Sequence, residues 1–361
     1  MILLNPGPVT LSPRVRNALQ RDDLCHREPE FAELMLRLRN GLERVYPNSS
    51  RSYVAVLLTS SGTGAVEAML STFAPRDAST LIASNGVYGE RMATMLERQG
   101  KPYVHVVGCW TEPIKLDQVI TALDAHPEVA RMAVVHHETT TGRLNRLDEL
   151  ARLCSKRDVE LLIDAVSGFG GEDIPLDQWR PMAIAGTASK CLHGVPGISF
   201  VLCDGGAIAS NSRHATTLYL DLEGYYHEQL KGWSPFTQSV QGCFALQEAL
   251  EEFFEGGGWR ARRQRYRHIA QEIRQTLAQL GVRTLLAEDE SSAVLTSYRI
   301  PSGDNYERIH DALKALGFVI YAGQGDLGRS IFRIAHMGTI SDEDLRCLIA
   351  ALRIVFGANK A

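Results

Sequence analysis

The sequence predicts an α/β protein in which a mainly parallel sheet lies between layers of helices. Short apolar runs alternate with helical stretches from residue 53 to about residue 200, which is the order of elements that a parallel sheet requires. The runs carry aliphatic or β-branched side chains on both faces, as expected of strands buried between two helix layers. A shorter mixture of helices and strands after residue 256 predicts a second, smaller α+β unit.

Proline and glycine divide the chain. Pro6, Pro8 and Pro13 predict an extended start, because proline fixes its own φ and restricts the residue before it. The three glycines at 256–258 should interrupt any regular element. We therefore expect an extended segment over residues 1–17, a large domain over residues 18–255 and a small C-terminal domain over residues 256–361.

The large domain should begin with a helix over Glu28–Tyr46, because its apolar residues recur at three- and four-residue spacing. This stripe comprises Phe31, Leu34, Met35, Leu38, Leu42 and Val45. The strands expected after it are Tyr53–Leu58, Thr80–Ala83, Tyr103–Val107, Met132–His136, Glu160–Ile163 and Ile198–Leu202.

The C-terminal domain should begin with a long helix over Trp259–Leu280. Five arginines between Arg260 and Arg267 could form an anion-binding patch, but no aromatic residues suited to base stacking accompany them, so a solvated helix face is favoured. Ser341 and Asp344 resemble a capping box that opens the last helix, with Asp in place of the usual Glu or Gln. The elements between these two helices are expected at Val294–Ile300, Asn305–Leu316, Phe318–Tyr321 and Ile331–Ala335.

Composition excludes several classes of protein. The 361 residues are 45% apolar and carry 38 basic and 42 acidic side chains, a net charge of −4, which argues against a nucleic-acid binder. No apolar run of 18 residues is present, so we expect no membrane span, and the N-terminus does not resemble a secretory signal. The seven cysteines are scattered and odd in number, which favours reduced thiols and a cytoplasmic protein.

Three segments of the large domain carry the residues suited to chemistry. In the first, a strand leads through Ser61, Gly62, Thr63 and Gly64 into good helix formers. The free backbone N–H groups and positive end of such a helix suit a phosphate dianion. The segment is neither a Walker sequence nor a GxGxxG motif, and a tight turn without a ligand is an equally good interpretation.

The second and third segments each contain one ionisable residue among small and apolar neighbours. Asp164 ends a buried strand, where α/β sheets place ligands, although it could instead cap a nearby loop or helix. Lys190 lies in a stretch of small residues with glycines on both sides. Desolvation there would lower the pKa of its amine and make it a nucleophile, unless the lysine simply extends from a loop to solvent.

Together the three segments provide what pyridoxal phosphate requires. The phosphate needs a cup of N–H donors, the pyridine nitrogen needs a carboxylate to keep it protonated, and the aldehyde needs a lysine amine to bond to. The hydroxyl and glycine turn, Asp164 and Lys190 meet these needs in one chain.

The chain resembles the class V, fold type I pyridoxal-phosphate aminotransferases over nearly its whole length. Within that class it most resembles the 2-aminoethylphosphonate–pyruvate aminotransferases. The motifs that carry the resemblance are Leu4–Thr10, Cys25–Phe31, Ser61–Gly64, Asn85–Arg91, His137–Gly142, Ile163–Ser167, Ser189–Cys191 and Phe332–Ile334. They are highly specific for the class and less specific for the substrate.

The resemblance implies a role for individual residues. Ser61, Gly62 and Thr63 would hold the phosphate, and Tyr88 would stack on the pyridine ring, although alone it would more often be a core residue. Thr141 and its threonine neighbours would reach the region of the ring hydroxyl, Asp164 would pair with the ring nitrogen, and Lys190 would bond to the aldehyde. Thr237 would reach the phosphate of a partner subunit, which implies a homodimer with shared sites. Arg333 would bind the acidic group of the substrate through its planar fork.

The chain departs from the phosphonate-specific relatives at two places. Those relatives usually carry Pro-Gly-Lys where this chain has Ala322, Gly323 and Gln324, and Arg-Phe-Thr where it has Pro235, Phe236 and Thr237. The departures affect the substrate assignment and leave the cofactor assignment intact. The basic residues that would replace the missing cations are Arg16, Arg27 or Lys231.

Two other constellations are disfavoured. His136 and His137 should point to opposite faces of a strand, so they cannot easily bind one ion and we expect no metal. Cys191 has no visible His or Asp partner, which favours core packing over a nucleophile.

The implied function is transamination of 2-aminoethylphosphonate with pyruvate, which gives phosphonoacetaldehyde and L-alanine in phosphonate catabolism. The nearest alternative is an alanine–glyoxylate or serine–pyruvate aminotransferase. A cysteine desulfurase is disfavoured because no cysteine lies on a glycine-rich loop near the C-terminal strands. A non-catalytic pyridoxal-phosphate-binding protein remains as an alternative of another class, against which the intact Lys190 and Asp164 argue.

Overall fold

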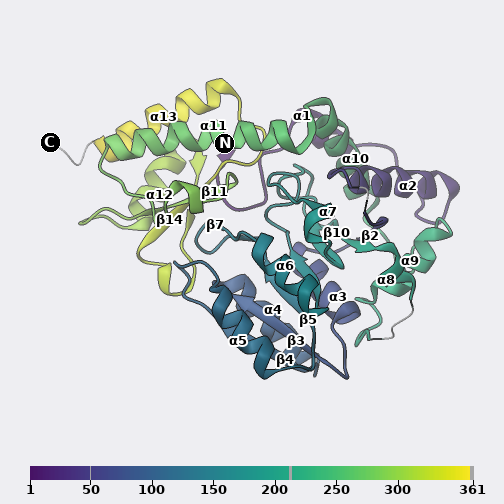
Figure 1. Cartoon of the computed structure of the whole chain (residues 1–361). Helices are drawn as coiled ribbons and strands as arrows, with labels where there is room; N and C mark the ends of the chain where they lie inside the picture. The colour runs from purple at the N-terminus through teal and green to yellow at the C-terminus, as the bar shows by residue number, and fades with distance from the viewer. Residues whose placement is uncertain (49, 211–213, 358–361) are drawn as a thin grey trace.

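A seven-stranded sheet forms the centre of the computed structural model, which describes residues 1–48, 50–210 and 214–357 (Figure 1). Its strand order is β2-β10-β9-β8-β5-β3-β4. Only β10 runs antiparallel to its neighbours, so the sheet is mainly parallel, as predicted. The strands are β2 (Tyr53–Leu58), β3 (Ser79–Ser84), β4 (Tyr103–Val107), β5 (Val129–Val135), β8 (Glu160–Asp164), β9 (Ala183–Thr187) and β10 (Ser199–Asp204).

Strand β9 was not predicted, although the other six strands of the sheet were. Its residues are Ala183, Ile184, Ala185, Gly186 and Thr187, which is a run too rich in small side chains to give a strand signal. The small residues are required by packing, because a Cβ on Gly186 would lie 2.4 Å from the ring of Phe200 on β10. The strand is completely buried.

Helices cover both faces of this sheet. Alternate residues of the strands enter two separate apolar clusters, so both faces are buried. Residues of α2 (Pro29–Glu43), α5 (Leu116–Ala125), α6 (Asp148–Arg157), α7 (Leu176–Trp179) and α10 (Val240–Glu255) pack in one cluster. Those of α3 (Gly62–Phe73), α4 (Val87–Arg98), α8 (Gly205–Ala209) and α9 (Leu222–Leu230) pack in the other.

The C-terminal third has its own sheet and apolar cluster. Its long helix α11 runs beside α13 along the top of the view in Figure 1. The division into domains at residue 256 stays a prediction. The helices are α11 (Gly258–Gln279), α12 (Tyr306–Ala315) and α13 (Asp342–Gly357), and the strands are β11 (Leu295–Arg299), β12 (Phe318–Val319), β13 (Tyr321–Ala322) and β14 (Ile331–Ala335). The remaining short elements are β6 (His137–Glu138), β7 (Arg143–Leu144) and the 3₁₀ turns η1 (Glu288–Glu290) and η2 (Gly325–Leu327).

The N-terminal segment is not extended throughout, which corrects the expectation for residues 1–17. Strand β1 (Ile2–Leu3) pairs in parallel with β12, but helix α1 (Pro13–Ala18) begins at the third proline. The Ser12 hydroxyl caps this helix by accepting from the Val15 N–H at 3.1 Å. Pro13 suits the first helical position, where its missing N–H would have no partner within the helix.

The arginines of α11 correct a second expectation, because they are not simply solvated. Arg262 donates to the Cys191 carbonyl at 2.7 Å and Arg263 pairs with the buried Glu172 carboxylate at 2.9 Å. Arg265 pairs with Asp342 at 2.5 Å. The arginine-rich face of α11 therefore ties this helix to loops of the large domain and to the start of α13.

The capping box at α13 is confirmed. The Asp344 N–H donates to the Ser341 hydroxyl at 3.0 Å, and the Ser341 N–H donates to the Asp344 carboxylate at 2.9 Å. Among the described residues, no helix is long and apolar enough to cross a membrane.

Candidate active site

The candidate site lies where the carboxyl ends of the central strands meet. Strand β2 ends before Ser61, β8 ends at Asp164, and β9 ends three residues before Lys190. These strands point the same way, because β10 is antiparallel both to β2 and to β9. The three predicted segments therefore reach one edge of the sheet, which is where α/β proteins bind ligands.

The Lys190 amine is held away from bulk water by the N-terminal segment. Its Nζ donates to the Pro6 carbonyl, and Gly7 lies so close that a Cβ there would be 2.8 Å from the lysine Cδ. Removal from water lowers the pKa of Lys190 to about 8, and the positive charge of Arg333 acts in the same direction. About a tenth of the amine is therefore neutral at pH 7, far more than for an ordinary lysine, and this form can act as a nucleophile or base.

The Asp164 carboxyl is buried at the end of β8. One oxygen accepts from the Val166 N–H at 2.9 Å. Burial raises the pKa of Asp164 to about 6, while the Val166 hydrogen bond and the charges of Arg91 and Lys190 oppose this rise. In the described part of the chain it forms no ion pair, so the site presents a buried acid suited to a cationic or protonated ligand atom.

The first turn of α3 provides the expected phosphate cup. Ser61 caps the helix and accepts from the Gly64 N–H at 3.4 Å, and both Ser61 and Thr63 are exposed. The first N–H groups of a helix have no acceptor within the helix, and they lie at the positive end of its dipole. Gly62 is required here, because a Cβ would lie 2.5 Å from Cγ1 of Val166.

Tyr88 lies beside this cup, on the first turn of α4. It lines one small cavity together with Thr63 and Asp164, so the structure brings these three predicted residues together. Arg91 joins them, with its guanidinium 4.7 Å from the Tyr88 ring centre and Nη1 donating to the Thr63 hydroxyl at 3.3 Å. Arg91 was not predicted as a site residue; its only signal was its place in the Asn85–Arg91 motif.

Thr141 belongs to a tight turn that Glu138 organises. The Glu138 carboxylate accepts from the Thr140 N–H at 3.1 Å and from the Gly89 N–H at 3.4 Å, which joins this turn to α4. Burial raises the pKa of Glu138 to about 7. Within the described residues the Thr141 hydroxyl is buried without a hydrogen-bond partner. A buried hydroxyl without a hydrogen-bond partner is suited to form a hydrogen bond with an oxygen of a ligand.

Arg333 on β14 brings a cation from the C-terminal third to the same place. Its Nε donates to the Ala322 carbonyl and its Nη1 to the Thr139 carbonyl, each at 2.8 Å. The residue is 1% exposed, and it has no ion pair with any described residue. A buried guanidinium without a counter-charge requires an anionic ligand.

Thr237 is the one predicted residue that the structure does not bring to the others. It is exposed on the loop before α10. The residues after it anchor this loop near the phosphate cup, since the Ser239 N–H donates to the Thr59 hydroxyl at 2.9 Å. The role expected of Thr237 requires a second subunit and stays a prediction.

The proposed compensating cations are also distant or engaged. Arg16 and Arg27 are exposed, and Lys231 pairs with Glu228 at 2.7 Å. The contacts of the described residues place none of the three at Arg333. The side chain that accepts a hydrogen bond from Arg333 is that of Gln324, whose Oε1 lies 3.2 Å from Nη1.

The histidine pair behaves as its strand position predicts. His137 lies between the Ser292 hydroxyl at 2.9 Å and the Ser167 carbonyl at 3.3 Å, whereas His136 packs edge-on against Trp179. No cluster of three or more possible metal ligands is found in the described ranges. Cys191 is buried, and burial raises the pKa of its thiol to about 12, which leaves it unreactive.

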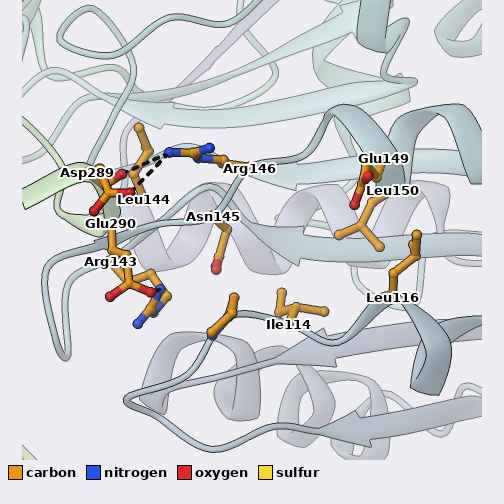
Figure 2. Close-up of a pocket in the computed structure, with 11 residues that line it drawn as sticks. Ile114, Leu116, Arg143, Leu144, Asn145, Arg146, Glu149, Leu150, Asp289 and Glu290 are labelled. Carbon is orange, nitrogen blue, oxygen red and sulfur yellow. Dashed lines mark hydrogen bonds and ion pairs between the residues drawn. The ribbon is translucent and has the colours of Figure 1, made fainter. Parts of the chain in front are cut away.

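A larger cavity elsewhere does not compete with this site. Figure 2 shows the cavity of about 400 Å³ that Ile114, Leu116 and Arg143 line with eight other residues. It contains none of the predicted site residues. Its charges are satisfied internally, because Arg143 pairs with Glu290 at 2.9 Å and Arg146 lies 3.9 Å from Asp289.

The residues present fit pyridoxal phosphate. The cup at Ser61–Thr63 is open, the Thr141 hydroxyl is unsatisfied within the described residues, and the Asp164 carboxyl is buried without a cation. These three features match the phosphate, the ring hydroxyl and the ring nitrogen, while Lys190 supplies the amine for the aldehyde.

Comparison with known proteins agrees with this geometry. The chain is 35% identical to a 2-aminoethylphosphonate–pyruvate transaminase of Aeromonas hydrophila, over 97% of this chain and 94% of that one. It is 34% identical to a protein of the same name from Salmonella paratyphi C, over 98% and 96% of the two chains.

Solved structures of similar shape include the alanine–glyoxylate aminotransferase of a Nostoc species, with a TM-score of 0.90, 27% identity and coverage of 98% of this chain and 94% of that one. An aspartate aminotransferase of Thermus thermophilus has a TM-score of 0.89 and 26% identity, with 99% of each chain covered. The sequence model of the family described as aminotransferase class-V matches residues 15–326. The chain therefore belongs to the class V aminotransferases.

Proposed function

We propose that this protein is a pyridoxal-phosphate-dependent aminotransferase that moves the amino group of 2-aminoethylphosphonate to pyruvate, giving phosphonoacetaldehyde and L-alanine in phosphonate catabolism. The names of its curated relatives support the substrate pair. The observation that carries the proposal is that Asp164 and the buried Arg333, which has no ion pair with a described residue, both lie near enough to Lys190 for their charges to act on its amine.

The cofactor would be held by residues from five elements. Ser61, Gly62 and Thr63 would bind the phosphate, Tyr88 would lie against the ring, Thr141 would bond to the ring hydroxyl, Asp164 would hold the proton on the ring nitrogen, and Lys190 would bond to the aldehyde. When bound, pyridoxal phosphate supplies an electron sink for the pair left when a proton leaves the donor carbon.

Lys190 performs the proton transfers. As a free amine it would be a base whose pKa burial lowers to about 8, so near neutral pH it could take the proton from the nitrogen-bearing carbon of the donor. The same amine would hold that proton and deliver it in the next proton transfer. In the protein without its cofactor, the carbonyl of Pro6 accepts a hydrogen bond from this amine.

Arg333 binds the phosphonate and so positions the donor. Its fork is fixed by the carbonyls of Ala322 and Thr139, and none of the hydrogen bonds of the described residues uses its Nη2. The two N–H groups on that nitrogen are available to the acidic oxygens. Because the guanidinium is held from two sides, the donor carbon would be presented to Lys190 in one orientation.

A homodimer is part of the proposal, with Thr237 reaching the phosphate of the partner subunit. Large apolar side chains are exposed near this residue, including Leu218 at 81%, Trp233 at 43% and Tyr219 at 41%. Tyr219 also packs against Phe236, next to Thr237, with ring centres 5.0 Å apart. Exposed apolar residues gathered in this way are typical of a protein interface. We also place the protein in the cytoplasm, since its seven thiols are unpaired.

The test is a half-reaction on the purified holoenzyme. Adding 2-aminoethylphosphonate without pyruvate should bleach the cofactor absorption band, and adding pyruvate should restore it and release alanine. L-alanine with glyoxylate, and L-serine with pyruvate, serve as alternative pairs. Bleaching by alanine and serine, with none by 2-aminoethylphosphonate, would overturn the substrate and favour an alanine–glyoxylate or serine–pyruvate enzyme. No response to any amine would overturn the transaminase itself.

A further inference from the structure

Gln324 contacts the predicted substrate-binding arginine directly. It lies in the loop between β13 and β14, and its Oε1 accepts from Arg333 Nη1 at 3.2 Å. Two residues earlier, at the end of β13, the Ala322 carbonyl accepts from Arg333 Nε at 2.8 Å. Strand β13 and the loop after it therefore contact the guanidinium through a backbone carbonyl and through a neutral side chain.

Chemistry fixes the orientation of the Gln324 amide. A guanidinium has five N–H donors and no acceptor, so the amide atom that faces it must be the oxygen. The amide nitrogen is bonded to the same carbon, so two further N–H donors lie next to the guanidinium. Among the hydrogen bonds of the described residues, neither Arg333 Nη2 nor Gln324 Nε2 has an acceptor, so both nitrogens have N–H groups to offer a ligand.

The loop that carries Gln324 is packed in place. Gly325 lies so close to Trp110 that a Cβ would be 2.7 Å from the indole ring, and its φ of +49° is also in the left-handed region. The indole Nε1 in turn donates to Glu90 on α4 at 2.7 Å. A Cβ on Gly323 would lie 2.2 Å from the Leu327 carbonyl. The position of the amide is therefore set by the fold as well as by Arg333.

We propose that Gln324 is a specificity-determining residue that binds the acidic group of the amino donor together with Arg333. This proposal rests on the proposed function and deepens it. A phosphonate has three oxygens, so two can meet Arg333 while the third meets the amide nitrogen. A carboxylate has two oxygens, which the two N–H groups of Arg333 Nη2 can occupy without the amide. Gln324 thus favours a phosphonate over a carboxylate on the same carbon skeleton.

The experiment compares three amines with the holoenzyme: 2-aminoethylphosphonate, β-alanine and propylamine. They share a two-carbon arm and end in a phosphonate, a carboxylate and a methyl group. Gln324→Met keeps the length of the side chain and removes the amide. We expect it to raise KM for 2-aminoethylphosphonate about tenfold with little change in kcat, as for one lost hydrogen bond to a charged group. Smaller changes are expected for β-alanine and none for propylamine.

A second variant tests the charge of the same position. Gln324→Glu would place a carboxylate on Arg333, so kcat/KM should fall at least 100-fold for both acids and stay unchanged for propylamine. Gln264→Met, an exposed glutamine on α11, is the matched control and should change nothing. Equal losses for propylamine and 2-aminoethylphosphonate in Gln324→Met would show a structural role and overturn the proposal.

Failure of the proposed function would be visible separately, in the wild-type protein. If the wild type does not turn over 2-aminoethylphosphonate, calorimetric binding of ethylphosphonate and propanoate still decides the role of Gln324. Preferential loss of ethylphosphonate affinity in Gln324→Met supports the proposal. Equal loss of both anions, or no binding of ethylphosphonate by the wild type, overturns it.

Discussion

Replacing Asp164 with Asn should stabilise the protein without its cofactor while weakening cofactor binding. Burial raises the pKa of Asp164 from 3.8 to about 6. The folded apo-protein therefore binds this proton more tightly than the unfolded chain does. The stability linked to the proton is present below pH 3.8 and is lost as the pH rises through about 6, where a charged carboxylate must stay buried.

The size of the effect follows from the shift in pKa. A rise of about 2 units corresponds to a cost of about 3 kcal/mol at pH 8, where the folded and the unfolded states both carry the charge. At pH 5 the folded carboxyl is largely protonated, and the cost falls to about 1.5 kcal/mol. Asn removes this cost, and its Oδ1 can still accept from the Val166 N–H. For a chain of this length, about 3 kcal/mol corresponds to about 4 °C in Tm.

The assay is thermal unfolding of the apo-protein and the holoprotein at pH 8 and pH 5. Apo Asp164→Asn should melt about 4 °C above the apo wild type at pH 8 and about 2 °C above it at pH 5. The holoprotein should respond in the opposite direction, because the ring nitrogen loses its counter-charge. Asp22→Asn, at an exposed position, is the control and should change neither form. An apo variant that melts below the wild type at pH 8, or that gains equally at both pH values, would refute the reasoning.

The pKa of the Lys190 amine is lowered to about 8, so the amine should react with pyridoxal phosphate about tenfold faster at pH 9 than at pH 7, and the rate should then reach a plateau. Stopped-flow absorbance of the apo-protein measures this rate. A rate that still rises at pH 10 would indicate a lysine with an ordinary pKa. Gly62→Ala should weaken cofactor affinity about tenfold, because its Cβ would lie 2.5 Å from Val166. Adding Val166→Ala should restore most of the cofactor affinity, as measured by equilibrium dialysis. If the affinity is not restored, a clash with Val166 is not the cause of the loss. Lys101→Met should lower the free energy of unfolding by about 2 kcal/mol, because the ammonium donates to the carbonyls of Leu70, Ser71 and Ala74 at the end of α3. An unchanged Tm would contradict this.

The features that the sequence predicts well are those with local signals. The apolar residues of α2 repeat every three or four positions and those of β2 and β5 form continuous runs, so the burial of these elements is visible in the local sequence. Asp164 and Lys190 stand out for the same reason, since each is an isolated charge among small or apolar neighbours. Strand β9, which precedes Lys190, was missed because close packing against Phe200 demands small residues there.

The features that could not be predicted depend on pairing between distant segments. Nothing near β10 shows that it runs antiparallel to β2 and β9, because strand direction is set by the path of the connections. The contact between Gln324 and Arg333 also depends on the pairing of β13 with β14. Glu138 was quoted only as part of a motif, and its link to Gly89 becomes visible only when α4 and the turn after β6 are placed together.

The contact between Lys190 and Pro6 has a consequence for how the enzyme matures. The segment that covers the lysine is anchored by the pairing of Ile2 with Phe318, so it cannot take its final position until a strand far along the chain has been synthesised. Contacts this far apart in sequence form late, because a very long loop must close before they stabilise anything. A nascent chain would thus have its reactive amine uncovered until Phe318 has been made, and residues fused ahead of Met1 would act directly on the surroundings of that amine.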